Sequence, residues 1–120
     1  MFHWIIESRR RQVTQLADGD LSWQEYHKLL NVIDGARIHH WRNLFDATDA
    51  HLAMTSADLL NLGARIRDQA SRHTMGPLAI VTPRVETESF ARFLGFLATA
   101  DRPIRIFRNI ERAQIWLDSA

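Results

Sequence analysis

Histidine is the residue type in this chain with the most obvious chemical potential, because imidazole binds metals and exchanges protons near neutral pH. The six histidines are His3, His27, His39, His40, His51 and His73. No two have the i, i+4 spacing of a helical zinc site, and the adjacent His39 and His40 would point in different directions if extended. His51 follows Asp46 and Asp49 in an expected loop, but aspartates there are more typical of a solvated turn. The sequence therefore predicts no metal site and no cofactor.

A serine near a histidine is the other combination that bears on catalysis. Nucleophilic catalysis needs a hydroxyl, a base within reach and a third group that orients the base. Ser56, with His51 nearby in sequence, is the one suggestive pair, but serine and threonine are common helix caps. The five glycines are scattered and form neither a phosphate loop nor a dinucleotide fingerprint. We expect a protein that is not an enzyme.

Composition narrows the class of protein further. The 120 residues are 46% hydrophobic, which suits one domain over residues 1–120 with a real core. Fifteen basic and fourteen acidic residues give a net charge of +1, which argues against a nucleic-acid binder. Cysteine is absent, so disulfides and thiol chemistry are excluded. No apolar run approaches the ~18 residues of a membrane helix, and the apolar start is too short for a signal peptide. We expect a cytoplasmic protein.

The N-terminal half shows strand periodicity and then helix periodicity. Alternation at Phe2, Trp4 and Ile6 predicts a strand, and residues 8–10 suit a hairpin tip. A second strand is expected to stop at the turn signal of residues 18–20. Ser22 and Glu25 have the spacing of a capping box, which starts a helix expected to end near Gly35. Residues 41–47 then predict a buried strand.

The C-terminal half alternates helices with strands. A second cap at residues 55–58 precedes a helix with an apolar face at Leu59, Leu62, Ile66 and Ala70. Residues 78–81 are a continuous apolar run that suits a central strand covered on both faces. A third helix carries Phe90, Phe93, Leu94 and Leu97, a last strand covers residues 103–107, and Asn109 caps a final helix.

The resulting order is β-β-α-β-α-β-α-β-α. Strands that alternate with helices indicate parallel neighbours joined by right-handed crossovers, and the opening hairpin adds an antiparallel strand. The predicted fold class is α/β, a single mixed sheet of about five strands with about four helices. Periodicity alone does not specify the strand order.

The chain resembles the SpoIIAA-like, or STAS, domains over nearly its whole length. The residues that carry the resemblance are Gly19-Asp20-Leu21-Ser22 with Glu25-Tyr26, Leu44-Phe45-Asp46, Ala79-Ile80-Val81-Thr82-Pro83, and Ile106-Phe107-Arg108-Asn109 with Ala113 and Trp116-Leu117. The resemblance implies a fold more than an activity. Family members include bacterial anti-sigma-factor antagonists and STAS/SEC14-type proteins of unknown role.

The resemblance also implies where a phosphorylation switch would lie. In the antagonists, a motif of the form Asp-Ser-Ser-Gly opens the helix after the third strand, and its second serine is phosphorylated. Here the aligned residues are Thr55, Ser56, Ala57 and Asp58, so the acceptor position is Ala57, which has no hydroxyl. A phosphate on Thr55 or Ser56 would be repelled by Asp58. We expect the family's switch to be absent.

Two surfaces are predicted to bind a partner. In open α/β sheets, ligands bind beyond the carboxyl ends of the strands, which here predicts a rim formed by Asp46, Asp49, Thr55, Ser56, Asp58, Arg84 and Arg108. The second surface is an apolar contact face of Phe90, Phe93 and Phe96, where the apolar stripe is wider than one contact needs. We expect a non-enzymatic regulatory module that binds a protein partner or self-associates. The alternative is a carrier of a small apolar, lipid-like ligand, and a hydrolase acting through Ser56 ranks third.

Overall fold

The computed structural model describes residues 1–83, 88–97 and 100–120, and the side chains of 88–91 lie outside that description. Within these residues, five strands form one sheet in the order β1-β2-β3-β4-β5. The elements are β1 (Phe2–Glu7), β2 (Gln12–Ser22), α1 (Trp23–Ala36), β3 (Arg42–Ala53), α2 (Ser56–Arg72), β4 (Leu78–Val81), α3 (Glu88–Leu97), β5 (Ile104–Phe107) and α4 (Ile110–Ser119). β1 is antiparallel to β2, and the remaining pairs are parallel. The predicted fold class and element order are confirmed.

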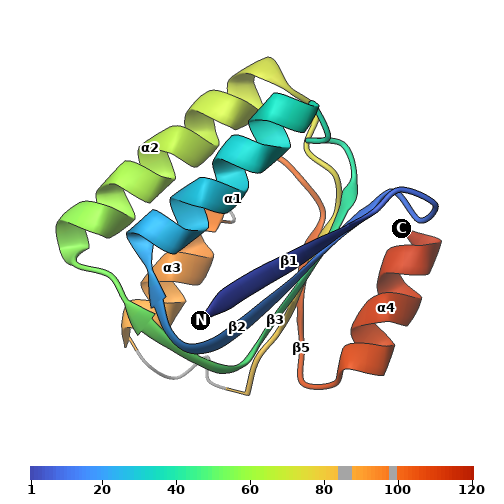
Figure 1. Cartoon of the computed structure of the whole chain (residues 1–120). Helices are drawn as coiled ribbons and strands as arrows, with labels where there is room; N and C mark the ends of the chain where they lie inside the picture. The colour runs from blue at the N-terminus through green and yellow to red at the C-terminus, as the bar shows by residue number, and fades with distance from the viewer. Residues whose placement is uncertain (84–87, 98–99) are drawn as a thin grey trace.

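The helices cover the two faces of the sheet unequally. α1, α2 and α3 lie on one face, and α4 lies alone on the other (Figure 1). The larger core fills the space under the three helices and includes the fully buried Phe45, Leu62 and Phe93. A smaller core joins Leu44 and Val81 to α4. All four residues of β4 are buried, as expected for a strand covered on both faces.

The pair of β2 and β3 is longer than the sequence predicts. β2 continues through residues 18–20, and β3 continues to Ala53 instead of ending at residue 47. The predicted turn and the predicted loop are both wrong, because parallel pairing between the two strands holds these polar residues extended. Gly19 has a φ of +76°, which glycine adopts without a steric cost, and the register with β3 shifts by one residue between Leu16 and Asp18.

Helix starts follow the sequence closely, and the end of α1 lies one residue from the expected position. Both capping boxes are present, with Ser22 accepting from the Glu25 N–H and Thr55 from the Asp58 N–H. Asn109 caps α4 as expected. α1 ends at Ala36, one residue past the predicted Gly35, and its cap Arg37 takes a left-handed conformation with φ 54°. Arg37 turns the chain toward a cluster of histidines.

Among the described residues, no helix has both the length and the apolar character needed to cross a membrane.

Candidate functional site

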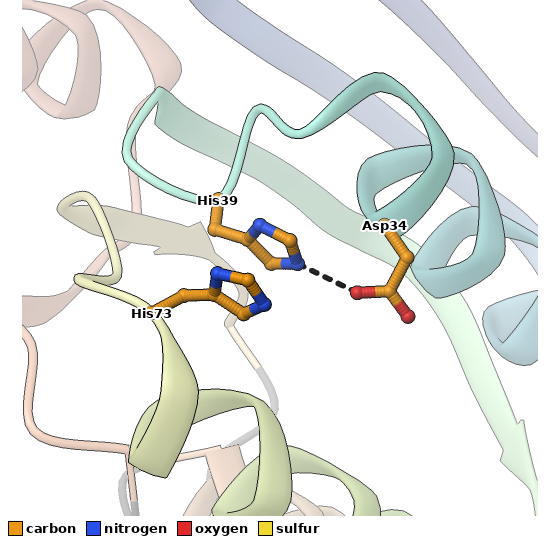
Figure 2. Close-up of side chains that lie close together, drawn as sticks. All are labelled: Asp34, His39 and His73. Carbon is orange, nitrogen blue, oxygen red and sulfur yellow. Dashed lines mark hydrogen bonds and ion pairs between the residues drawn. The ribbon is translucent and has the colours of Figure 1, made fainter.

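Two histidines and an aspartate meet where α1 and α2 end (Figure 2). Asp34 lies in the last turn of α1, His39 in the segment between α1 and β3, and His73 directly after α2. The left-handed Arg37 reverses the chain after α1, so that His39 returns toward Asp34. The two helix ends therefore place three potential metal ligands together, although the sequence separates them widely.

The three side chains are in close contact. His39 Nε2 lies 2.6 Å from Asp34 Oδ1, and the imidazoles of His39 and His73 stack with centroids 3.7 Å apart and planes 4° from parallel. One ligand atom from each of the three residues lies within 4.8 Å of the others. His39 is buried, whereas Asp34 and His73 are exposed. The cluster borders a hollow of about 660 Å³, which is also lined by Arg37, His40 and Thr74.

The Asp34 carboxylate is held by two further donors from α2. Arg65 Nη2 donates to Oδ2 at 2.9 Å, and Gln69 Nε2 donates to Oδ1 at 3.0 Å. Burial raises the pKa of this carboxyl, but the hydrogen bonds from His39, Arg65 and Gln69 outweigh it and hold the pKa below its usual range. Gln69 is only 4% exposed. The carboxylate is therefore ionised at neutral pH and fixed in orientation.

A glycine lets the two halves of the cluster approach each other. The Gly76 N–H donates to the His39 carbonyl at 2.8 Å, and the Gly76 carbonyl accepts from Arg102 Nε at 2.6 Å. A Cβ on Gly76 would overlap the carbonyl oxygens of Trp41 and His40. The absence of a side chain at this position thus permits the approach of the two segments that carry His39 and His73.

The sequence did not predict this cluster, because His73 lies far from Asp34 and His39 in the chain. The spacing between His39 and His73 matches no local periodicity. One signal was available: Asp34 falls at the expected end of the first helix, and His73 comes shortly after Ala70, the last apolar position of the second. Only the packing of α1 beside α2 shows that these ends coincide (Figure 1).

The structure does not gather the predicted rim into one surface. Asp46 is level with Val81 and Phe107, the last residues of β4 and β5, as a rim residue should be. β3 continues to Ala53, however, so the start of α2 lies roughly 20 Å further along at about 3.3 Å per residue. Asp49 and Arg108 are exposed, and Arg84 lies outside the described residues.

The three rim residues at the start of α2 are engaged in local contacts. Thr55 and Asp58 satisfy each other's backbone N–H groups in the capping box. Ser56 Oγ accepts from Arg92 Nη1 of α3 at 3.3 Å. These contacts fix the start of α2 against α3, and Ala57 lies in the same first turn without a hydroxyl.

The predicted apolar face on α3 is largely internal. Phe93 is fully buried, with its ring 5.5 Å from that of Tyr26 and 6.1 Å from that of Phe45. Phe96 is half-buried and packs over Gly63 of α2, where a Cβ would overlap its ring. The side chain of Phe90 lies outside the described part of the chain. The extra width of the stripe thus covers α2 as well as the sheet.

A different apolar surface is open to solvent, on the face of the sheet that carries α4. α4 packs on β3, β4 and β5 and meets the start of β2, where Gln114 is hydrogen-bonded to Gln12. β1 and the rest of β2 have no covering helix on that side (Figure 1). Ile5, Leu16 and Ile110 are exposed there by 64%, 45% and 39%. We call these three residues the open sheet face. They line a hollow of about 280 Å³ together with neighbours that include His3 and Asp46.

These features together define an α/β protein with a mixed five-stranded sheet. The structure is similar to the crystal structure of an uncharacterised protein of the DUF3478 family from Shewanella loihica PV-4, described as having a SpoIIAA-like fold. The TM-score is 0.63 at 18% sequence identity, over 97% of this chain and 93% of that chain. The chain thus has a SpoIIAA-like fold. No protein-family model and no curated protein matches its sequence.

Proposed function

We propose that the chain is a cytoplasmic, single-domain, non-enzymatic regulatory module that binds a second copy of itself through the open sheet face. The observation that carries the proposal is the exposure of Ile5, Leu16 and Ile110 on one contiguous, hollowed surface. A contiguous exposed apolar patch commonly marks an interaction site, whereas single exposed apolar residues are ordinary. Position 57 supports regulation by association instead of phosphorylation, because alanine has no acceptor hydroxyl.

Two further features favour a second copy as the occupant. β1 is an edge strand of the sheet and lies beside the open sheet face, so a two-fold contact can pair both strands and faces. The net charge of +1 produces little repulsion between two copies. An isologous contact would bury Ile5 and Leu16 of each copy and remove them from water.

Multi-angle light scattering of the purified chain tests the proposal. We expect a dimer, and Leu16→Asp should convert it to a monomer because a buried charge without a partner is costly. Leu60→Asp is the matched control, since Leu60 is 60% exposed on α2, away from the open sheet face. A wild-type chain that remains monomeric at about 100 µM, where even micromolar association is populated, refutes self-association.

A second function, the binding of a small apolar ligand, is favoured by a hollow between α3 and β5. It measures about 450 Å³ and is lined by Leu94, Gly95 and residues 104–106, a size within the range of small-molecule sites. The hollow lies at the outer edge of the contact between α3 and the sheet, because Phe93 fills the space between them further in. Titration with a fluorescent fatty acid should show saturable binding that Ile106→Glu weakens and Ile115→Glu, on α4, does not. Equal binding by both variants would count against the carrier.

A further inference from the structure

We propose that Asp34, His39 and His73 form an open binding site for a divalent transition-metal ion such as Zn²⁺. Two imidazoles and a carboxylate are a common three-residue donor set for zinc, with a further position left for an exogenous ligand. In Figure 2 both rings carry a nitrogen on the side that faces the Asp34 carboxylate. The site lies at the joint ends of α1 and α2, away from the open sheet face, so its fate is independent of the proposed self-association.

The geometry requires only small movements to bind an ion. Zinc–nitrogen and zinc–oxygen bonds of about 2.0–2.2 Å place tetrahedral ligand atoms roughly 3.3–3.6 Å apart. The three ligand atoms here lie within 4.8 Å of one another, and His39 Nε2 and Asp34 Oδ1 are closer than that ideal at 2.6 Å. An ion would replace the proton that joins these two atoms. The parallel His73 ring must tilt to aim its lone pair, and its exposed position after α2 permits that rotation.

The surroundings of Asp34 select the class of metal. Arg65 already neutralises the single carboxylate at 2.9 Å, so the site lacks the excess of negative oxygen that Ca²⁺ and Mg²⁺ require. Imidazole nitrogen suits Zn²⁺, Cu²⁺ and Ni²⁺, which bind it through its lone pair as well as by charge. Arg65 and Gln69 also orient the carboxylate from α2, as outer partners of metal ligands commonly do.

His73 separates this proposal from a purely structural role for the cluster. The contacts of Asp34 with His39, Arg65 and Gln69 join α1 to α2 and would be useful in any folded protein. They give no reason for an exposed histidine stacked against the buried His39. A metal does give a reason, because His73 supplies the third ligand. The neighbouring hollow, lined by Arg37, His40 and Thr74, leaves room for a further ligand on the ion.

Zinc titration by calorimetry tests the site on the full chain, freed of any affinity tag and treated with chelator. We expect one equivalent of Zn²⁺ to bind. His73→Ala should weaken the affinity by about 100-fold or more, because removing a direct ligand should cost at least as much as removing a residue that only orients a ligand. His51→Ala is the matched control, because it removes an exposed histidine from β3, outside the cluster. Asp34→Asn should also weaken binding, and Co²⁺ should give the visible absorption of a four-coordinate ion only when His73 is present.

The outcomes are distinguishable. Circular dichroism establishes whether each variant is folded. His73→Ala should keep the wild-type spectrum, because the side chain of His73 is exposed. If His73→Ala binds Zn²⁺ like the wild type, or if His51→Ala loses as much affinity as His73→Ala, the assigned site is wrong. The proposal is also overturned if the wild-type chain does not bind Zn²⁺ at about 1 mM, a concentration at which even a weak site is occupied.

Discussion

Replacement of Gly76 by alanine should destabilise the protein far more than the same replacement at Gly35. A Cβ on Gly76 would overlap backbone oxygens of His40 and Trp41, which no side-chain rotation relieves. The segment must therefore move away from the His39 loop. A Cβ on Gly35 would meet no atom within 4 Å, and Gly35 lies within α1, where alanine is preferred to glycine.

The magnitude follows from the hydrogen bonds of the buried Gly76. Displacement breaks the N–H bond to the His39 carbonyl, and a buried polar group left unpaired costs about 1–3 kcal/mol. The displacement also strains the hydrogen bond from Arg102 Nε to the Gly76 carbonyl. Hydrogen bonds to charged groups contribute about 1.5–3 kcal/mol. Burial lowers the pKa of Arg102 to about 10, so the guanidinium is charged at neutral pH. We expect Gly76→Ala to cost about 3–5 kcal/mol.

Urea denaturation followed by tryptophan fluorescence measures both variants. Gly35→Ala should raise the free energy of unfolding by about 0.5–1 kcal/mol, the usual gain from removing a helical glycine. If Gly76→Ala lies within about 0.5 kcal/mol of the wild type, the size of an ordinary surface effect, the close approach does not exist as described. Zinc binding by Gly76→Ala should also weaken, since the His39 loop moves relative to His73.

Substitutions of Arg37, Gly63 and Asp34 should also change the stability of the fold. Arg37→Gly should raise the free energy of unfolding by about 0.5–1 kcal/mol, measured in urea, because glycine adopts the left-handed cap without a Cβ clash. Gly63→Ala should lower it by about 1–3 kcal/mol through overpacking against Phe96, and the loss should shrink in a Phe96→Ala background. Hydrogen bonds from His39, Arg65 and Gln69 hold the folded-state pKa of Asp34 below its usual range, so the stabilisation is present above the unfolded-state pKa and is lost as pH falls through the folded-state pKa. Stability measured against pH should therefore fall more steeply at acidic pH for the wild type than for Asp34→Asn, and parallel curves would contradict the role of this carboxylate.

Local sequence signals predicted the elements well where one residue and its near neighbours decide the structure. The capping boxes at Ser22 and Thr55 depend on contacts three residues apart, so spacing alone reveals them. The buried strand of residues 78–81 is apolar throughout because both of its faces are covered. These signals were enough for the fold class and the order of the elements.

Local sequence patterns failed to predict the structure where residues distant in the sequence supply the stabilising contacts. Residues 18–20 and 46–51 have turn-like composition, but the partner strand satisfies their backbone and holds them extended. The aromatic stripe of α3 suggested an exposed contact, yet Phe96 is matched by Gly63 on another helix. In each case the deciding partner lies far away in the sequence.

The sequence by itself determined the α/β class, the helix starts and the missing hydroxyl at Ala57, because these depend on side-chain type and on spacing within a few residues. The tertiary structure alone decided the strand order, the exposure of the open sheet face and the meeting of Asp34, His39 and His73. Those features depend on which helix ends and strand faces pack together. Packing joins residues through space, and no local periodicity in the chain encodes the distance between them.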